Sequence, residues 1–370
     1  MWRDNLNRRL QARARIRAMV IADQPTMFDP QDRTSWYIDG AIVRLRLWGT
    51  EYAHPLPESC APLKLGSAPA CDVQLHDKAG RLSREHAMLA HEPTGWEIRD
   101  LGSKNGLWVD GLRTTRCTLQ PGVKIQLGGL TLVAESLKFI GLRSLVCRLL
   151  GWAPERQADV DEALQNLRDS AIQRTPLILV GGGDLAPVAA RLQRATLGPD
   201  APFIVDDGSD ASVVVHAAMQ GTLCVPIRGR VRASAIADAV HALEITTRPR
   251  LVLCATKAGD AAALLGAKPG QLAVIAMPPL SVRTDEILRI VHEAADDLVR
   301  EMGAQSSGFT MHDLERLQSI KFSGMADLEG SLRRVIAMRI WGVTAGAKKL
   351  GLKHSSLSTW ARSKNRKLST

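Results

Sequence analysis

Hydrophobic and polar residues alternate along the first part of the chain and then take up longer, helix-like spacings. Between Tyr37 and Ser136, segments such as AIVRLRLW, WEIRDL and VKIQLGGLTLV alternate in this way, and Gly, Pro and Asp separate them. Short strands at this spacing predict an antiparallel β-sandwich over residues 38–136. Within it, Asp110-Gly111 suits the two-residue turn of a type I′ hairpin.

Beyond the sandwich, the pattern changes to alternating helices and strands. Residues 137–157 are basic and amphipathic, which predicts a connecting helix ending near Pro154; contact with a membrane surface is a second interpretation. Strand-like runs such as TPLILVGGG and PRLVLCATKAG then alternate with helical runs over residues 158–283. This alternation predicts a parallel sheet flanked by helices, and residues 284–330 predict a purely helical segment.

The composition is that of a globular protein with more than one domain. The chain has 370 residues, of which 45% are hydrophobic and 23% charged. No apolar run approaches the ~18 residues of a membrane span, and the Arg-rich residues 1–37 lack the apolar core of a secretory signal. We interpret residues 1–37 as a solubilising basic extension and linker, with a functional role as the alternative. The six scattered cysteines predict reduced thiols in a cytoplasm and no zinc site.

The positive charge of the chain is concentrated at its C-terminal end. The formal net charge is +10, and residues 331–370 contain ten Lys and Arg but no Asp or Glu. The first 330 residues are therefore neutral. Such a concentration is expected of an element that contacts the phosphates of nucleic acid, and a solvated basic tail is the alternative interpretation.

Several short motifs between residues 63 and 135 resemble those of the forkhead-associated (FHA) domain. In chain order they are Gly66, Asp72-Val73-x-Leu75, Ser83-Arg84-x-His86, Asp100-Leu101-Gly102-Ser103-x-Asn105-Gly106, Val109-x-Gly111 and Leu127-Gly128. The resemblance implies a β-sandwich whose loops at one end bind phosphothreonine. It also implies that Ser83 hydrogen-bonds the phosphate, that Asn105 holds the peptide backbone and that His86 braces the loop.

One position departs from the FHA pattern. The family has Gly-Arg where this chain has Gly66-Ser67, and Ser67 lacks the bidentate guanidinium that would contact the phosphate. The positive charge would then come from other side chains near the motifs, namely Arg84, Lys104, Arg81 or Lys64. The alternative is an FHA fold that binds proteins without needing a phosphate.

Residues 158–330 resemble the AAA+ domain of bacterial activators that remodel the sigma-fifty-four RNA polymerase, but the catalytic groups are missing. The phosphate-loop position, residues 181–188, has glycines but neither the Lys nor the hydroxyl that ATP and magnesium require. Other residues take the remaining catalytic positions: Pro226 and Ile227 for the acidic pair, Lys257 for the sensor Asn and Asp327 for the second sensor Arg. The interval before Gly221 is too short for the insertion that contacts the sigma factor. We therefore expect no enzyme activity and no cofactor, and a scaffold role instead.

The C-terminal segment, residues 331–370, resembles the Fis-type helix-turn-helix that ends the same activators. The expected seam between its helices consists of Ala347, Leu350, Leu352, Leu357 and Trp360, with Gly351 in the turn and Ser355 as the cap of the second helix. The residues expected on the DNA-binding face are Lys353, His354, Ser356, Ser358, Thr359, Arg362 and Lys364, with Arg366 and Lys367 on phosphates. The family pairs as a dimer, for which the apolar stripe Leu332, Val335, Ile336 and Ile340 is the candidate contact.

Together these patterns predict a multidomain protein: an all-β FHA sandwich, an α/β AAA+-like core with a helical lid, and an α-helical helix-turn-helix. We expect a bacterial-type cytoplasmic regulator that reads a phosphothreonine partner written by a Ser/Thr kinase and binds double-stranded DNA. One alternative is an FHA-based interaction scaffold without specific DNA binding. A second is an ATP-dependent sigma-fifty-four activator, against which the missing catalytic groups count.

Overall fold

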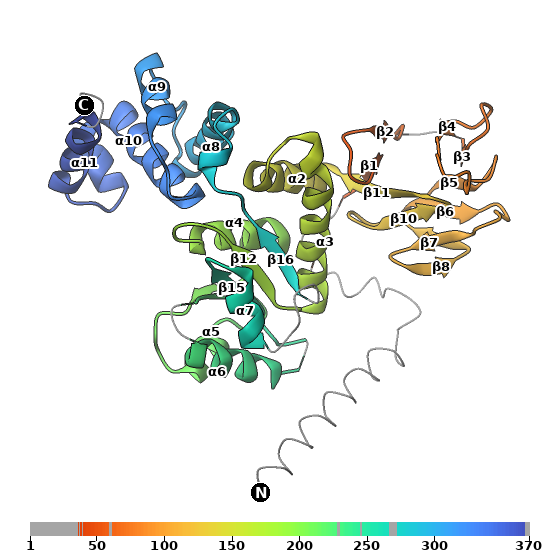
Figure 1. Cartoon of the computed structure of the whole chain (residues 1–370), viewed down its shortest axis with the longest axis horizontal. Helices are drawn as coiled ribbons and strands as arrows, with labels where there is room; N and C mark the ends of the chain where they lie inside the picture. The colour runs from red at the N-terminus through yellow and green to blue at the C-terminus, as the bar shows by residue number, and fades with distance from the viewer. Residues whose placement is uncertain are drawn as a thin grey trace, which may run out of the picture. The chain divides into compact units, whose positions relative to one another are not determined.

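The computed structural model describes residues 36, 38, 40–58, 61–227, 230–244, 246–265 and 272–366, without the side chains of residues 230–232 and 363–366 (Figure 1). The predicted basic extension therefore lies outside the described residues, apart from Trp36. None of the described helices is both long and apolar enough to span a lipid bilayer.

Two β-sheets form the first part of the described chain. One sheet has the order β2-β1-β11-β10-β7-β8 and the other β4-β3-β5-β6-β9. The strands are β1 (Ile42–Leu47), β2 (Ala53–Pro55), β3 (Leu63–Gly66), β4 (Val73–Gln74), β5 (Ala87–Glu92), β6 (Gly95–Asp100), β7 (Leu107–Val109), β8 (Leu112–Thr114), β9 (Arg116–Thr118), β10 (Lys124–Leu127) and β11 (Leu130–Ser136). All described pairs are antiparallel except β3 with β4.

The core of this sandwich is built by the inward-facing residues of both sheets. Leu65, Leu89 and Ile98 from one sheet and Leu107 and Ile125 from the other are fully buried in one cluster. Side chains of a strand point alternately to its two faces, so the alternation read from the sequence places these residues inside. The structure confirms the predicted all-β sandwich.

The predicted hairpin turn is also present. Val109 pairs with Leu112 across a two-residue turn, in which Asp110 and Gly111 have φ angles of 48° and 83°. Positive φ at both positions is the property of a type I′ turn. Asp110 further stabilises it, because one carboxylate oxygen accepts a hydrogen bond from the backbone N–H of Lys124 at 2.9 Å.

A five-stranded parallel sheet with helices follows, as the alternating pattern predicted. Its strand order is β13-β14-β15-β12-β16. Its elements and those leading into it are α2 (Leu137–Leu150), α3 (Gln157–Gln173), β12 (Leu177–Val180), α4 (Ala186–Leu197), β13 (Phe203–Val205), α5 (Ala211–Ala217), β14 (Thr222–Pro226), α6 (Arg230–His241), β15 (Arg250–Ala255), α7 (Ala258–Leu265) and β16 (Ala273–Ala276). The short helices α5 and α7 were not predicted. The valines of α5 favour a strand in a sequence-based prediction, because β-branched residues have low helix propensity. Asp210 is the N-cap of α5, and its side chain accepts a hydrogen bond from the Ser212 N–H.

Four helices complete the described chain: α8 (Ile287–Met302), α9 (Met311–Ser319), α10 (Met325–Lys349) and α11 (His354–Arg366). α10 is broken at Gly342, which has φ 74° and ψ 175°. The apolar stripe expected to form a dimer contact lies in its first half. That expectation is wrong for most of the stripe, because Leu332, Val335 and Ile336 are buried within the chain itself, where α10 packs on α8.

A buried ionic cluster joins β1 and β11 to α3. The Arg46 side chain is completely buried, its Nε donates to Glu135 at 2.6 Å, and its two terminal nitrogens donate to Asp161. Asp161 also accepts the backbone N–H of Gly49 at 2.6 Å. Burial opposes the charge of Arg46, but the hydrogen bond to Asp161 and the charge of Glu135 outweigh it and leave the pKa of Arg46 raised.

We predict that Asp161→Ala destabilises the chain by about 3–5 kcal/mol, because it leaves a buried guanidinium partly uncompensated. Asp159→Ala is the matched control. Asp159 lies two residues earlier on α3 in an exposed pair with Arg156, and its loss should cost no more than about 1 kcal/mol. Urea unfolding of both variants measures the difference, and equal destabilisation would contradict the role assigned to the Arg46 cluster.

Candidate functional site

Three loops at one end of the sandwich carry the site residues predicted from the FHA motifs. Ser67 follows β3, Ser83 and Arg84 lie between β4 and β5, and Lys104 and Asn105 lie between β6 and β7. Ser67 donates its backbone N–H to the carbonyl of Ser83 at 3.1 Å, and Lys104 donates its N–H to the Ser83 hydroxyl at 3.1 Å. The structure therefore brings all five residues together around Ser83.

The Ser83 hydroxyl is positioned to act as a donor. A serine hydroxyl has one hydrogen and two lone pairs. Because the oxygen already accepts the Lys104 N–H, its hydrogen remains for an acceptor outside the loops. The residue is half-buried, so the group is both fixed and accessible to a ligand.

His86 fixes two of the loops from beneath. Its ring is completely buried; Nδ1 accepts the Ser83 backbone N–H at 3.1 Å, and Nε2 lies 3.2 Å from the carbonyl oxygen of Gly106. Both contacts are satisfied when the hydrogen is on Nε2, which assigns the neutral tautomer. His86 therefore acts as a brace beneath the surface.

Asn105 and Gly66 each allow a close contact between two of the three loops. The Asn105 amide donates to the carbonyl of Arg81 at 2.6 Å, which leaves its own carbonyl oxygen for a ligand. A Cβ on Gly66 would lie 2.0 Å from the carbonyl oxygen of Arg84, so only glycine fits at this position. The spacing of Ser67 and Arg84 across the site thus depends on a residue without a side chain.

The positive charge available to the site comes from three exposed side chains. Arg81, Arg84 and Lys104 have no ion pair with a carboxylate in the part of the chain that the structure describes. Lys64, the fourth candidate, contacts both carboxylate oxygens of Glu85 at 3.1 Å and is locally neutralised. Ser67 itself is half-buried and contributes no charge.

Asp77 supports the site and was not among the predicted residues. Its carboxylate accepts four backbone N–H groups, from Ala79, Arg81, Leu82 and Gly129, at 2.8–3.0 Å. Burial raises its pKa, but these hydrogen bonds lower it further, so the pKa is below the usual Asp value. An Asp three residues before Gly80 is typical of turns, which is the local signal that could have indicated this role.

The glycine loop after β12 (Gly181–Gly183) is in close contact with residues 323–324. A Cβ on Gly182 would lie 2.2 Å from the carbonyl oxygen of Ser323, and one on Gly324 would lie 2.1 Å from the carbonyl oxygen of Gly182. Asp327 holds this approach by accepting the Ser323 N–H at 3.1 Å. Residues 323–324 thus pack directly on the backbone of this glycine loop.

The end of α10 and helix α11 form a second candidate surface, which we call the C-terminal helix pair (residues 343–366). Gly351 has φ 66°; its N–H donates to the carbonyl of Lys348 at 3.1 Å, and the N–H of Leu352 donates to that of Ala347 at 2.8 Å. This is a Schellman end, and it confirms the turn expected at Gly351. Ala347 and Leu357 are buried as expected, and Leu350, Leu352 and Trp360 are half-buried.

Two expectations for residues 331–370 need correction. α11 begins at His354, so Ser355 lies inside its first turn and is not the cap. The basic charge is also partly used within the chain: Arg333 pairs with Glu301, Arg339 pairs with Asp313, and the guanidinium of Arg334 lies 5.4 Å from the Trp360 ring. A charge count cannot separate such internal partners from exposed groups.

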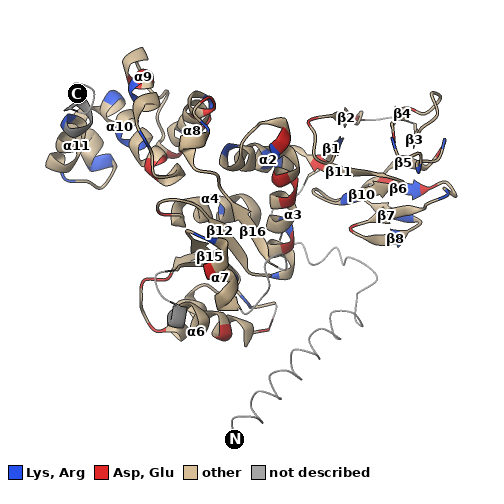
Figure 2. Cartoon of the chain, viewed as in Figure 1, with Lys and Arg blue, Asp and Glu red and all other residues tan. Residues whose placement is uncertain are grey.

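Figure 2 marks the Lys and Arg of the helix pair in blue, and most of the described polar side chains of the pair are exposed. The exposed ones are Thr344, Lys348, Lys349, Lys353, His354, Ser355, Ser356, Thr359 and Arg362, while Ser358 is half-buried. The side chains of Lys364 and Arg366, and the whole of Lys367, lie outside the described residues. Exposed cations and hydroxyls therefore lie at the end of α10, in the following turn and on α11.

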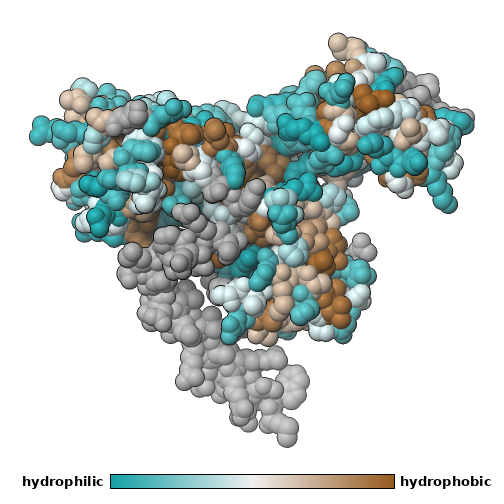
Figure 3. Space-filling model, turned by 180° about the vertical axis from the view of Figure 1, so that it is seen from behind, coloured by the Kyte–Doolittle hydropathy of each residue, from teal (hydrophilic) through white to brown (hydrophobic). Residues whose placement is uncertain are grey.

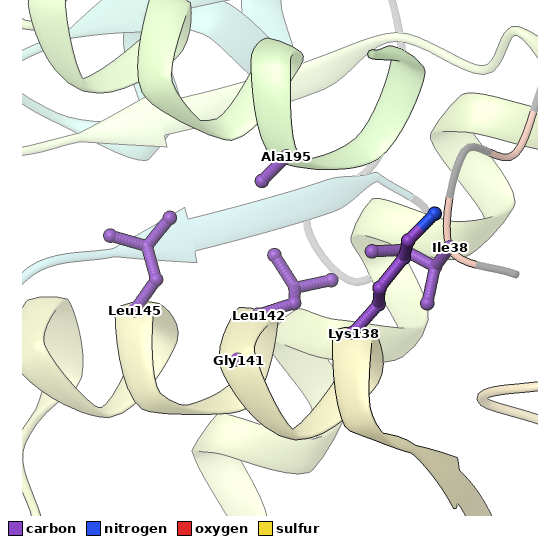
Figure 4. A pocket seen from close by; sticks show the side chains of 6 residues that line it. All are labelled: Ile38, Lys138, Gly141, Leu142, Leu145 and Ala195. Carbon is purple, nitrogen blue, oxygen red and sulfur yellow. The ribbon is translucent and has the colours of Figure 1, made fainter. Parts of the chain in front are cut away.

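The other surface features have fewer polar groups that could bind a ligand. A pocket of about 240 Å³ is lined by Ile38, Lys138, Gly141, Leu142, Leu145 and Ala195 (Figure 4). Its lining is almost entirely apolar. Hydrophobic and hydrophilic residues are interspersed on the face shown in Figure 3, and the exposed large hydrophobic side chains are spread over the sandwich, the α/β part and the helices.

Comparison with known proteins gives one family match. The family model described as "FHA domain" matches residues 63–128. No curated protein matches this chain.

Among solved structures, the FHA domain of the Chlamydia trachomatis CT664 protein is 28% identical and covers 25% of this chain and 95% of its own, with a TM-score of 0.23. Mycobacterium tuberculosis EmbR, solved with a low-affinity phosphopeptide, is 26% identical and covers 26% of this chain and 24% of its own, with a TM-score of 0.24. The N-terminal FHA domain of S. cerevisiae Rad53p, solved with a phosphothreonine peptide, is 23% identical and covers 25% of this chain and 92% of its own, with a TM-score of 0.23.

We predict that Asp77→Ala releases the loop before Ser83, because four N–H groups lose their acceptor. The loss of these hydrogen bonds should accelerate amide exchange of Arg81 and Leu82 at least about tenfold. Hydrogen-exchange mass spectrometry measures it. Asp72→Ala is the control, since Asp72 accepts the Lys64 N–H. Unchanged exchange at Arg81 and Leu82 would exclude this role of Asp77.

Proposed function

From the FHA domain that residues 63–128 match, we propose that this chain is a cytoplasmic regulator that reads a phosphothreonine partner and binds double-stranded DNA through its C-terminal helix pair. A Ser/Thr kinase would write the phosphate. The observation that carries the proposal is the assembly of Ser83, Asn105 and three uncompensated cations around one end of the sandwich.

The phosphate-binding role follows from the donors at that end. A phosphothreonine carries nearly two negative charges and three strong acceptor oxygens. The Ser83 hydroxyl would donate to one oxygen, and Arg84, Lys104 or Arg81 would supply the charge that Ser67 cannot. These side chains are exposed, so they can turn toward a ligand without breaking an existing ion pair. The Asn105 carbonyl oxygen would accept from the peptide backbone.

We predict that a phosphothreonine peptide binds more tightly than its unphosphorylated form and that Ser83→Ala weakens this binding at least tenfold. The loss of a charge-assisted hydrogen bond costs about 1.5–3 kcal/mol. Because the partner is unidentified, the probe is a degenerate phosphothreonine peptide library with an unphosphorylated twin, measured by fluorescence anisotropy.

Thr94→Ala is the control for this experiment. Thr94 lies in the β5–β6 turn, at the opposite end of these two strands from Ser83, and it carries the same kind of hydroxyl. Equal affinity for both libraries would overturn phosphate reading and favour an interaction scaffold that does not need phosphate, as Ser67 in place of Arg suggests.

The α/β part would act as a catalytically dead AAA+-like scaffold. Gly182 and Gly324 support this, because their close backbone approach fills the phosphate-loop position with protein. Residues 181–188 also lack the Lys and the hydroxyl of a phosphate loop, and Pro226 and Ile227 take the place of the acidic pair. Purified chain should therefore release no inorganic phosphate from ATP with magnesium, and turnover that Gly182→Ala abolishes would contradict the scaffold role.

DNA binding by the C-terminal helix pair is supported by its exposed Lys353, His354, Ser356, Thr359 and Arg362. A recognition helix needs such residues to reach phosphates and base edges in the major groove. Lys364, Arg366 and Lys367 would add phosphate contacts. If the protein pairs at DNA, the contact involves a surface other than the buried stripe of α10.

We predict that Arg362→Ala weakens DNA binding and alters which sequence is preferred, by about 1–3 kcal/mol at one base step, because Arg362 lies on α11 within reach of the groove. Arg300→Ala is the control, since Arg300 is a strongly exposed arginine on α8 and removes the same charge elsewhere. Anisotropy with genomic fragments at several salt concentrations measures both. A full-length chain that shows no DNA affinity would support the scaffold alternative. Truncation at Gly330 is unsuitable, because it removes the buried Leu332 and Ile336.

A further inference from the structure

Two arginine side chains are buried side by side at the N-terminal ends of the strands of the parallel sheet. Arg250 is the first residue of β15 and is 0% exposed, and Arg174 ends α3 and is 8% exposed. Arg174 reaches the carbonyl of Gln220, two residues before β14, at 3.4 Å. Because β14 pairs with β15, the two guanidinium groups lie at the starts of neighbouring strands.

These two arginines differ from the other buried arginines of the chain. The others each pair with a carboxylate: Arg46 with Glu135 and Asp161, Arg143 with Glu51, Arg148 with Asp297, Arg168 with Asp110, and Arg283 with Glu286. Within the described ranges, neither Arg174 nor Arg250 has an acidic partner. Burial, with the charge of Arg174 added, lowers the pKa of Arg250 to about 9, so the group stays protonated at neutral pH.

The contacts that Arg250 does make are with neutral groups. Its Nη1 donates to the Thr196 hydroxyl at 2.8 Å and its Nε to the Thr222 hydroxyl at 3.3 Å. The Thr196 hydroxyl donates in turn to the carbonyl of Leu192 at 2.7 Å. Nη2 of Arg250 and Nη1 of Arg174 are buried, and no described protein group accepts from either. Each of the two guanidinium groups therefore keeps a buried N–H donor without an acceptor among the described protein groups.

The backbone at Arg174 gives a second, independent indication. Arg174 has φ 55° and ψ 28°, the left-handed conformation at the end of α3 that glycine adopts without strain. A residue with a Cβ is unfavourable there. The backbone conformation therefore does not explain why an arginine is present at this position. The Arg174 side chain extends to the start of β14.

We propose that Arg174 and Arg250 form a binding site for a small inorganic anion, either a halide or an oxyanion such as phosphate. Buried charges in proteins are paired, and guanidinium groups hold anions through directed N–H donors. The Thr222 hydroxyl would add a third donor. The site lies where the strands of the sheet begin, and Gly181–Gly183 lie where β12 ends. The site is therefore separate from the glycine loop and from the FHA loops.

The test uses the full chain in gluconate buffer at constant ionic strength, to which chloride or inorganic phosphate is added. An anion that binds only the folded state raises Tm, by roughly 5 °C at a concentration one hundred times its Kd. The two anions distinguish a halide site from an oxyanion site. We expect a saturable rise with one of them in the natural chain.

Two matched variants and a control locate the site. Arg174→Gln should lose the anion-dependent rise. Arg174→Glu, of the same size, would supply a carboxylate for Arg250 and should raise Tm in gluconate above that of Arg174→Gln, without a further response to anion. Arg194→Gln is the control, because Arg194 is a largely exposed arginine on α4, and it should keep the full response. A natural chain with no response, or equal responses in the natural chain, Arg174→Gln and Arg194→Gln, would overturn the proposal.

Discussion

The burial of Arg46 is the interaction on which the connection between the sandwich and the following helices depends. A guanidinium removed from water needs compensating charge on several sides. Glu135 provides it from β11 and Asp161 from α3, and Asp161 also holds the backbone of Gly49. Strands at both ends of the FHA region and a helix beyond it are therefore fixed by one side chain. The Asp110–Arg168 pair, which links the β7–β8 turn to the same helix, adds a second connection.

At the end of the sandwich that carries Ser83, the loop backbones are fixed by hydrogen bonds, whereas the cationic side chains are exposed. The hydrogen bonds of His86, Asp77 and Asn105 hold the loop backbones, and Gly66 allows two of them to touch. Arg81, Arg84 and Lys104 at that end are exposed and have no ion partner in the described chain. The Ser83 hydroxyl is thus held in place while the positive charges around it can move, although the guanidinium expected at position 67 is absent. Charge can be supplied from several directions, but a directed hydrogen bond cannot.

In the α/β part, the loop at the end of β12 contacts residues that are distant in sequence. Glycines remain after β12, yet the backbone of residues 323–324 packs against them at distances that exclude a side chain. The close contact joins the helical segment to the end of β12. At the opposite end of the strands, Arg174 and Arg250 are buried without a carboxylate partner in the described chain.

The sequence by itself determined the elements whose cause is local. Alternation of apolar residues gave the strands of the sandwich, Asp110-Gly111 gave its hairpin turn, and Gly351 gave the turn before α11, because each depends on neighbouring residues. Only the tertiary structure decided which charges are available. Arg46 and Asp161 are 115 residues apart, and Arg333 is neutralised by Glu301 on another helix. The stripe on α10 likewise had the spacing of a dimer contact, but its packing on α8 buries it. Pairing and burial depend on residues distant in sequence, so no local pattern could reveal them.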